Sequence, residues 1–308
     1  MKFANRLGMA GSAAAFAFLA AAIVAAPQEA PAPLAHFHHI HLNNTDPKAA
    51  IEFYTSKFDC EAAKFGGSID AVWAQKSWIF FNHVNQPPPS EIVSAIYHMG
   101  WGAEDMKATY QKQLEMGTKF ETPITDIAVA MGRGMQGRFW FAYVEGPDHA
   151  LIELNTANHH HFGHIHLTSD EPVAAGEWYM KEFGMTRRGS GPPSRDPYSY
   201  KGVQVAPSMS LMMDNVNFII FPTGLVSGLF PKAWEGRTTY ESPRGRAIDH
   251  FALSVDNLDQ TLARLKADGV KVVEAPKMRM GGKLRSAFVE GPDNVQIEVV
   301  EGHATKGD

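Results

Sequence analysis

Cysteine is nearly absent from this chain, in which Cys60 is the only one among 308 residues. A single cysteine excludes an intrachain disulfide, a zinc site built from several thiolates and a lipid-modified cysteine at the end of an N-terminal leader. The chain also has no run of basic residues, and its formal net charge is -5 at pH 7. It therefore lacks the electrostatic pattern of a protein that binds nucleic acid.

Long apolar runs are absent as well, apart from one near the N-terminus. Lys2 and Arg6 precede an apolar stretch at 13–26, and the Pro-rich segment 27–33 follows it. This order is typical of a secretory signal peptide, and the stretch is shorter than the roughly 20 residues that cross a bilayer. The sequence thus predicts a signal peptide and linker at 1–30, a periplasmic or secreted protein, and no membrane segment once the signal is removed.

Histidine, in contrast, is abundant, and most of its 14 copies cluster where strands are expected to begin. Three motifs each occur twice, at 142–153 and 287–298, at 39–42 and 164–167, and at 97–101 and 249–253. Repeats of this kind indicate tandem copies of one structural unit. We therefore divide the chain into a first module at 36–156 and a second module, with long inserted loops, at 162–301.

Each module divides again into two halves that have the same order of elements. A half opens with a His-led strand, continues into a helix and ends with further strands, which gives the order β-α-β-β-β. In the first half, Asp46 can cap a helix that begins at Pro47, and Asp170 and Pro172 repeat this pattern in the third half. The predicted fold class is therefore α+β.

Strand alternation decides which side chains share a surface. His39 and His41 point to one side of their strand, and Ile40 and Leu42 point to the other. Glu153 likewise opposes the apolar residues next to it. We expect the apolar faces to pack under the helices, which leaves the His and Glu faces free to line a concave surface.

A duplicated β-α-β-β-β unit that opens with this His-led strand and closes with Gly-Pro-Asp and Ile-Glu resembles the vicinal oxygen chelate superfamily. Its members include glyoxalase I, extradiol dioxygenases, epimerases and antibiotic-resistance proteins. The resemblance covers nearly the whole chain after the leader and implies two cupped mixed-sheet modules. It does not identify a reaction, because this fold supports unrelated chemistries.

The resemblance also implies a divalent metal ion. Metal-binding members place one ligand on the first strand of a module, another on the first strand of its second half, and a Glu on the last strand. Carried over to this chain, the implied ligands are His39, His98 and Glu153 in the first module, and His164, His250 and Glu298 in the second. Two imidazoles and one carboxylate favour Fe(II), with Mn(II), Zn(II) and Ni(II) as alternatives.

Two departures from the family pattern narrow the chemistry. Glyoxalase-like members add a Glu at the end of the first half, whereas this chain has no carboxylate at 80–83 or 219–222. Extradiol dioxygenases place a Tyr shortly before the ligand Glu, which Tyr143 matches, but the histidine expected upstream of that Tyr is missing. His41 and His166 share strand faces with the implied ligands, so the candidate catalytic residues are His41, Tyr143 and His166.

The leading hypothesis is an exported metal-dependent enzyme that acts on a small substrate with adjacent oxygens, as a dioxygenase or as a lyase or isomerase. The alternative is a protein that sequesters a small molecule in the same concave surface without a metal. Either way, we expect a small-molecule partner. The sequence leaves a homodimer open, and it leaves open whether each cup closes within its own module or by exchange between modules or chains.

Overall fold

The computed structural model of the chain describes residues 34–132, 134–200 and 203–306. The predicted signal peptide and linker at 1–30 lie outside the described residues. The described part contains four β-α-β-β-β units with additional short elements, which confirms the predicted α+β fold. None of the helices in this part combines the length and the apolar character that a membrane span requires.

The elements of the four units follow one another along the chain. The first unit contains β1 (His36–Asn44), α1 (Pro47–Lys57), β2 (Glu61–Phe65), β3 (Ile69–Trp73) and β4 (Trp78–His83). The second contains β5 (Ile96–Ala103), α2 (Met106–Glu115), β6 (Phe120–Asp126), α3 (Ile127–Met131), β7 (Trp140–Glu145), η1 (Pro147–His149) and β8 (Leu151–Thr156). The third contains β9 (Phe162–Ser169), α4 (Pro172–Phe183), β10 (Thr186–Arg187), β11 (Tyr198–Tyr200), β12 (Val203–Val205), β13 (Met209–Met213), β14 (Val216–Pro222) and α5 (Thr223–Leu229). The fourth contains β15 (Ile248–Val255), α6 (Leu258–Ala267), β16 (Val272–Arg279), η2 (Met280–Gly282), β17 (Leu284–Glu290), η3 (Pro292–Asn294) and β18 (Gln296–Glu301).

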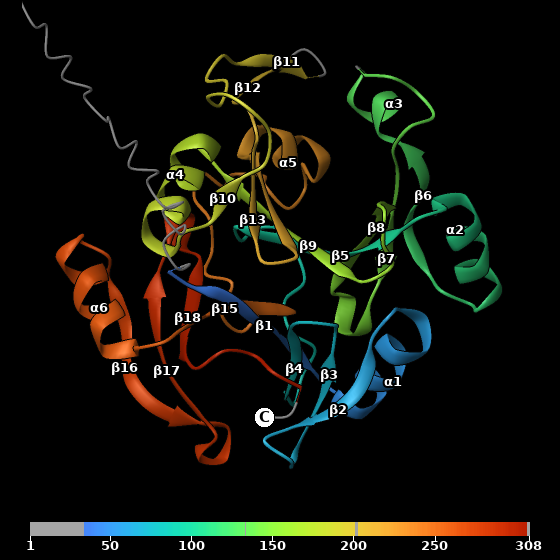
Figure 1. The fold of residues 1–308 in the computed structure, drawn as a ribbon. Coiled ribbons are helices and arrows are strands. Elements are labelled where there is room, and N and C mark those ends of the chain that lie inside the picture. Colours follow the sequence, from blue (N-terminus) through green and yellow to red (C-terminus); the bar gives the residue numbers. More distant parts are fainter. Residues whose placement is uncertain (1–33, 133, 201–202, 307–308) are drawn as a thin grey trace, which may run out of the picture. The chain divides into compact units, whose positions relative to one another are not determined.

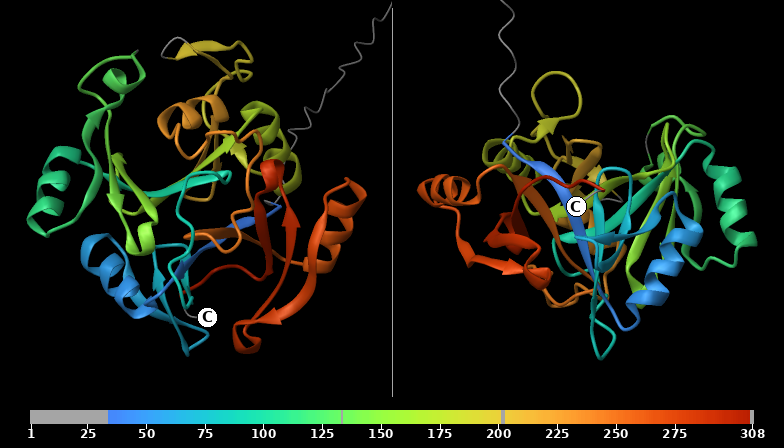
Figure 2. Two further views of the ribbon diagram at one scale, coloured as in Figure 1. Left: turned by 180° about the vertical axis from the view of Figure 1, so that it is seen from behind. Right: turned by 60° about the horizontal axis from the view of Figure 1, so that its bottom comes forward.

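The units combine into two 8-stranded sheets, and neither sheet coincides with one tandem module. One sheet has the order β16-β17-β18-β15-β1-β4-β3-β2 and joins the fourth unit to the first. The other has the order β10-β13-β14-β9-β5-β8-β7-β6 and joins the third unit to the second. Figures 1 and 2 show β1 lying beside the C-terminal strands and β5 beside β9. The sheets therefore form by exchange between modules of the same chain.

Each sheet is mixed, with one antiparallel pair at its centre. β1 pairs antiparallel with β15, and β5 pairs antiparallel with β9. The strands on either side of these pairs run parallel to them, as β4 does to β1 and β18 does to β15. The His-led strands of all four units thus occupy the centres of the sheets, where strands are buried on both faces.

The predicted N-cap residue is correct for α1 and wrong for α4. The Asp46 side chain accepts a hydrogen bond from the backbone N–H of Ala49 and caps α1, as predicted. The predicted cap of α4 by Asp170 is wrong, because Glu171 occupies the N-cap position and makes no side-chain capping bond. The Asp170 carboxylate instead accepts a hydrogen bond from Thr223 Oγ1 at 2.5 Å, which connects the start of α4 to α5.

Trp101 on β5 is the centre of a buried aromatic cluster that joins the β5–β9 sheet to α1 of the first unit. Its ring stacks on Phe58, just after α1, with a centroid distance of 4.6 Å, and on Tyr54 of α1 at 5.7 Å. It also meets the edge of Phe162 on β9 at 5.2 Å. Residues of the first, second and third units therefore share one core, in which Trp101 is fully buried.

We predict that Trp101→Ala lowers the free energy of unfolding by about 3–5 kcal/mol, because it removes a large buried ring and leaves a cavity. Urea unfolding followed by circular dichroism measures this loss. Trp140→Ala, at a half-buried position on β7, is the matched control and should cost clearly less. Equal losses in the two variants would contradict the central role of the Trp101 cluster.

Candidate metal sites

Two buried clusters of histidine and glutamate lie on the central strands, one in each sheet. The first, here called the Glu298 site, contains His39, His41, His250 and Glu298. The second, here called the Glu153 site, contains His98, Glu153, His164 and His166. In each cluster, one ligand atom from every residue lies within 4.8 Å of the others. All eight side chains are buried.

Strand register explains why these residues meet. In the Glu298 site, His41 on β1 lies opposite His250 on β15. Ala252, two residues further along β15, pairs with His39 on one side and with Glu298 of β18 on the other. Because alternate residues of a strand point to the same face, all four functional side chains project from one face of three adjacent strands.

The Glu153 site repeats this arrangement with a glycine at its centre. His98 on β5 lies opposite His166 on β9, and Gly100 pairs with both His164 and Glu153. A Cβ atom at Gly100 would lie 2.1 Å from the imidazole of His164. The absence of a side chain at this position therefore allows His164 to approach β5 and reach the cluster.

In the Glu298 site, the carboxylate holds two imidazoles. Glu298 Oε2 lies 3.0 Å from Nε2 of His39 and 3.1 Å from Nε2 of His250. Nδ1 of His250 lies 2.5 Å from Oδ1 of Asp249, whose other oxygen accepts a hydrogen bond from Asn43 Nδ2 at 3.0 Å. A carboxylate on one ring nitrogen orients the other nitrogen toward a metal position, as is common for histidine ligands.

In the Glu153 site, the carboxylate lies between two imidazoles and an amide. Glu153 Oε2 is 3.0 Å from Nε2 of His98, and Oε1 is 3.8 Å from Nε2 of His164. Asn155 Nδ2 donates to Glu153 Oε1 at 3.0 Å. Tyr143, directly opposite Glu153 on β7, accepts a hydrogen bond from the hydroxyl of Tyr97 at 3.1 Å. A phenol therefore lies beside this cluster.

Burial keeps most of these histidines uncharged. It lowers the pKa of His41 to about 3 and that of His164 to about 4, and it also lowers the pKa of His39, His98 and His166. His250 differs, since burial lowers its pKa but the contacts with Asp249 and Glu298 outweigh burial and raise it. The neutral imidazole is the form that binds a metal ion.

The same clusters contain polar atoms that lack a partner. Within the residues that the structure describes, both ring nitrogens of His41 and of His166 are buried and make no hydrogen bond. Burying an unpaired polar group costs about 1–3 kcal/mol. A divalent ion within reach of three imidazoles and a carboxylate would satisfy one nitrogen of each ring, so both clusters fit such an ion.

The structure groups the candidate ligands differently from the tandem modules. His39 does not meet His98 and Glu153, and His164 does not meet His250 and Glu298. The grouping by module is therefore wrong, because β1 pairs with β15 of the other module and β5 pairs with β9. His41 and His166, expected as proton-transfer groups, lie in the same clusters as the expected ligands.

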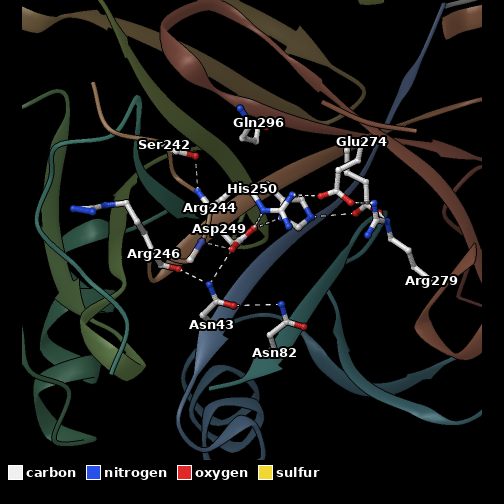
Figure 3. Close-up of polar contacts among 12 residues, drawn as sticks. Asn43, Asn82, Ser242, Arg244, Arg246, Asp249, His250, Glu274, Arg279 and Gln296 are labelled. Atoms are coloured by element: carbon white, nitrogen blue, oxygen red, sulfur yellow. Dashed lines mark hydrogen bonds and ion pairs between the residues drawn. The ribbon is translucent and has the colours of Figure 1, made fainter. Parts of the chain in front are cut away.

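Each cluster opens into a cavity of a different character. The cavity at the Glu298 site is about 290 Å³ and is lined by His41, His250 and Glu298 together with Arg244 and Arg279. The cavity at the Glu153 site is about 400 Å³ and is largely apolar, with Tyr143, Glu153 and His166 in its wall. Figure 3 shows Arg244 and Arg279 reaching toward His250 and Glu274.

Sequence reasoning missed the two arginines. Arg244 lies in the inserted segment that follows α5, and Arg279 is the last residue of β16. The length of that insertion indicated that it could cover a site, but no motif distinguished Arg244 from its neighbours.

Comparison with known proteins gives a family for both modules. The model of the family described as Glyoxalase/Bleomycin resistance protein/Dioxygenase superfamily matches residues 36–154 and 161–299. Over 57 residues, the chain is 40% identical to lactoylglutathione lyase of Salmonella typhimurium and 39% identical to a probable lactoylglutathione lyase of Arabidopsis thaliana chloroplasts. These matches cover 18% of this chain, 42% of the Salmonella protein and 16% of the Arabidopsis protein.

Among solved structures, glyoxalase I from Zea mays has a similar fold. It superposes with a TM-score of 0.61 and covers 87% of this chain and 92% of its own. The sequence identity is 13%, so the likeness concerns the fold alone.

We predict that the metal-free protein loses stability as the pH falls from about 7 to about 4. The folded-state pKa of His164 is about 4, below its value of about 6.5 in the unfolded chain. Between these pH values the unfolded chain binds more protons than the folded chain. The contribution of His164 to the free energy of unfolding is therefore fully present above pH 6.5 and is lost as the pH falls toward 4. Urea unfolding in EDTA at both pH values measures the loss, and His164→Gln should reduce it by a few kcal/mol. An unchanged loss in the variant would contradict the prediction.

Proposed function

Because this chain belongs to the Glyoxalase/Bleomycin resistance protein/Dioxygenase superfamily, we propose that it is an exported metal-dependent enzyme acting on a small substrate with adjacent oxygens. The observation that carries the proposal is the pair of buried clusters, each with three imidazoles and one carboxylate within 4.8 Å. Each cluster also borders a cavity that can admit a small molecule.

The ligands we propose are His39, His41, His250 and Glu298 for one ion, and His98, His164, His166 and Glu153 for the other. A bound divalent ion supplies Lewis-acid polarisation of a substrate oxygen or, as Fe(II), dioxygen chemistry. Fe(II) stays our first choice from the two imidazoles and one carboxylate that the family resemblance implies, and imidazole and carboxylate ligands also suit Mn(II), Zn(II) and Ni(II). In this assignment His41 and His166 act as ligands, because their ring nitrogens make no hydrogen bond to any other described residue.

The protein's own groups orient the proposed ligands and the substrate. Asp249 fixes the ring of His250 through Nδ1, and Asn155 fixes the carboxylate of Glu153. Burial, together with Tyr97 and Glu153, raises the pKa of Tyr143 well above its ordinary value. Its phenol therefore stays protonated and can donate a hydrogen bond to a substrate oxygen in the Glu153 cavity.

Lactoylglutathione lyase activity, for which the relatives above are named, is not our proposal. The strand on which glyoxalase-like members carry their additional Glu has Phe80 opposite His41 in one sheet and Ile219 opposite His166 in the other. His41 and His166 take the place of that carboxylate within the clusters. Replacing an anionic ligand by a neutral one makes the total charge of the metal site more positive.

A second candidate function is sequestration of an apolar small molecule without a metal. The observation in its favour is the cavity of about 400 Å³ at the Glu153 site, whose walls include Phe139, Phe141, Phe221 and Leu225. An apolar cavity with a few polar groups is typical of small-molecule binding sites. Metal content separates the two candidates, because sequestration requires no ion.

Metal stoichiometry of paired variants tests the proposal. The wild-type chain should hold two divalent ions after reconstitution. His39→Ala combined with His98→Ala should lose both, because these residues belong to different sites, whereas His39→Ala combined with His250→Ala should lose one. Elemental analysis of the gel-filtered protein measures this, and exposed His149→Ala is the control. Loss of one ion in the first double variant would contradict the grouping, and no ion in the wild type would favour sequestration.

Export can be tested separately. Its support is the order of basic, apolar and Pro-rich segments in the first 33 residues. Mass spectrometry of the chain from a periplasmic or culture fraction should show loss of roughly the first 20 to 35 residues, the usual range of signal lengths. An intact Met1 in that fraction would overturn the proposal of export.

A further inference from the structure

We propose that the two metal sites take different classes of ligand: the Glu298 site a small anion with a carboxylate beside a second oxygen donor, and the Glu153 site a largely apolar molecule that is uncharged in solution and carries its adjacent oxygens at one end. The inference rests on the proposed function, since it assumes that both sites hold an ion. It follows from the residues that line the two cavities, which differ although the metal ligands are the same.

Two arginines approach the Glu298 site from separate elements. Arg244, in the segment before β15, contacts Oδ1 of Asp249 through Nε at 2.9 Å and donates from Nη1 to Glu274 Oε1 at 3.3 Å. Arg279 of β16 donates from Nη2 to Glu274 Oε2 at 2.8 Å and from Nε to Ser286 Oγ at 2.9 Å. Glu274 thus holds both guanidinium groups near one another (Figure 3).

The arginines also share an aromatic surface. The guanidinium carbon of Arg244 lies 4.1 Å from the centre of the Phe288 ring, and that of Arg279 lies 4.8 Å from it. The edge of the same ring meets His250 at a centroid distance of 4.8 Å. Phe288 therefore positions both cations next to a proposed metal ligand, and these interactions restrict the side chains before any substrate binds.

Both guanidinium groups keep donors for a ligand. Each has five N–H groups, and the contacts above use Nε and Nη1 of Arg244 and Nε and Nη2 of Arg279. Arg244 and Arg279 line the same cavity of about 290 Å³ as His41, His250 and Glu298. A carboxylate in this cavity can accept hydrogen bonds from a guanidinium while a neighbouring oxygen faces the metal ligands.

The charges around this cavity balance only until an ion binds. The carboxylates of Asp249, Glu274 and Glu298 are paired with Arg244, Arg279 and Lys277. A divalent ion added to this set leaves a net positive charge in a largely buried site. Such a site favours an anion, because the attraction is stronger there than in water.

Among the residues that the structure describes, the cavity of the Glu153 site has no comparable cations. Its wall combines side chains from α3 and α5, such as Met131 and Leu225, with Phe139 and Phe141. Among the described residues that line it, none is arginine or lysine. An anion would lose its hydration there without a guanidinium to replace it, whereas an apolar group gains from burial against these walls.

Two probes and two single-site proteins test the inference. His98→Ala with Glu153→Ala leaves only the Glu298 site, and His250→Ala with Glu298→Ala leaves only the Glu153 site. Each is loaded with Co(II), and elemental analysis and the visible absorption of the ion report its occupancy. Oxalate, a dianionic chelator, and benzohydroxamic acid, an aromatic chelator that is uncharged in solution at pH 7 and releases one proton to the buffer when it chelates the ion, are then titrated into each protein. We expect oxalate to bind the Glu298 site at least about 10-fold more tightly than it binds the Glu153 site. Benzohydroxamic acid should prefer the Glu153 site by a similar factor.

Arginine variants of the protein with only the Glu298 site locate the cause. Arg244→Gln and Arg279→Gln should each weaken oxalate binding by about 10-fold while Co(II) occupancy stays unchanged. Arg285→Gln is the matched control, because Arg285 pairs with Asp259 and Glu301 outside this cavity. Arg244→Lys and Arg279→Lys keep the positive charge, so they should lose less affinity for oxalate than the Gln variants. The unfolding temperature of each variant shows whether a loss of affinity reflects misfolding.

The outcomes separate this inference from the proposed function. Absence of Co(II) from both single-site proteins would overturn the proposed function and the inference with it. Two outcomes would overturn the inference alone. One is full Co(II) occupancy with equal affinities of both sites for both probes, and the other is an affinity for oxalate that does not change in Arg244→Gln and Arg279→Gln. Tight binding of S-methylglutathione together with weak binding of oxalate would overturn the assignment to a small ligand.

Discussion

The antiparallel pairing of β1 with β15 and of β5 with β9 is the constraint on which both candidate sites depend. In each pair, one strand carries two histidines on the same face and the other strand carries one histidine. A strand that runs parallel to one member of the pair adds the glutamate. Because the pairs join units from different modules, neither module contains a complete cluster. A change that separates β1 from β15 would therefore disrupt the whole Glu298 site, because His39 and His41 would no longer lie next to His250 and Glu298.

Burial at the sheet centres then determines the chemistry available to these residues. Desolvation keeps His41, His98, His164 and His166 neutral. Among the described residues, both ring nitrogens of His41 and of His166 lack a hydrogen-bond partner, which suits a metal ion better than a packed core. The two sites differ outside the ligands. Asp249 and the arginines surround the Glu298 site with charge, whereas tyrosine and apolar side chains surround the Glu153 site. The repeated unit thus preserves the ligands while the inserted segments change their surroundings.

Local features of the sequence predicted the elements and the facing of their side chains, because alternation and capping depend on neighbouring residues. His39 and His41 share a face as expected, and the residues expected as ligands all lie in the two clusters. The grouping could not be predicted, since strand pairing between distant units depends on how the whole chain packs, including contacts such as that of Trp101 with Phe58. The role of Arg244 could not be predicted either, because the position of its side chain depends on contacts with Glu274 of β16 and Phe288 of β17, which are distant in the sequence.

Anomalous diffraction from crystals loaded with Co(II) locates each ion among its ligands. We expect two anomalous peaks per chain, one bounded by His39, His41, His250 and Glu298 and the other by His98, Glu153, His164 and His166. A peak that joins His39 to His98 and Glu153, or well-ordered side chains in both clusters with no peak, would contradict this expectation.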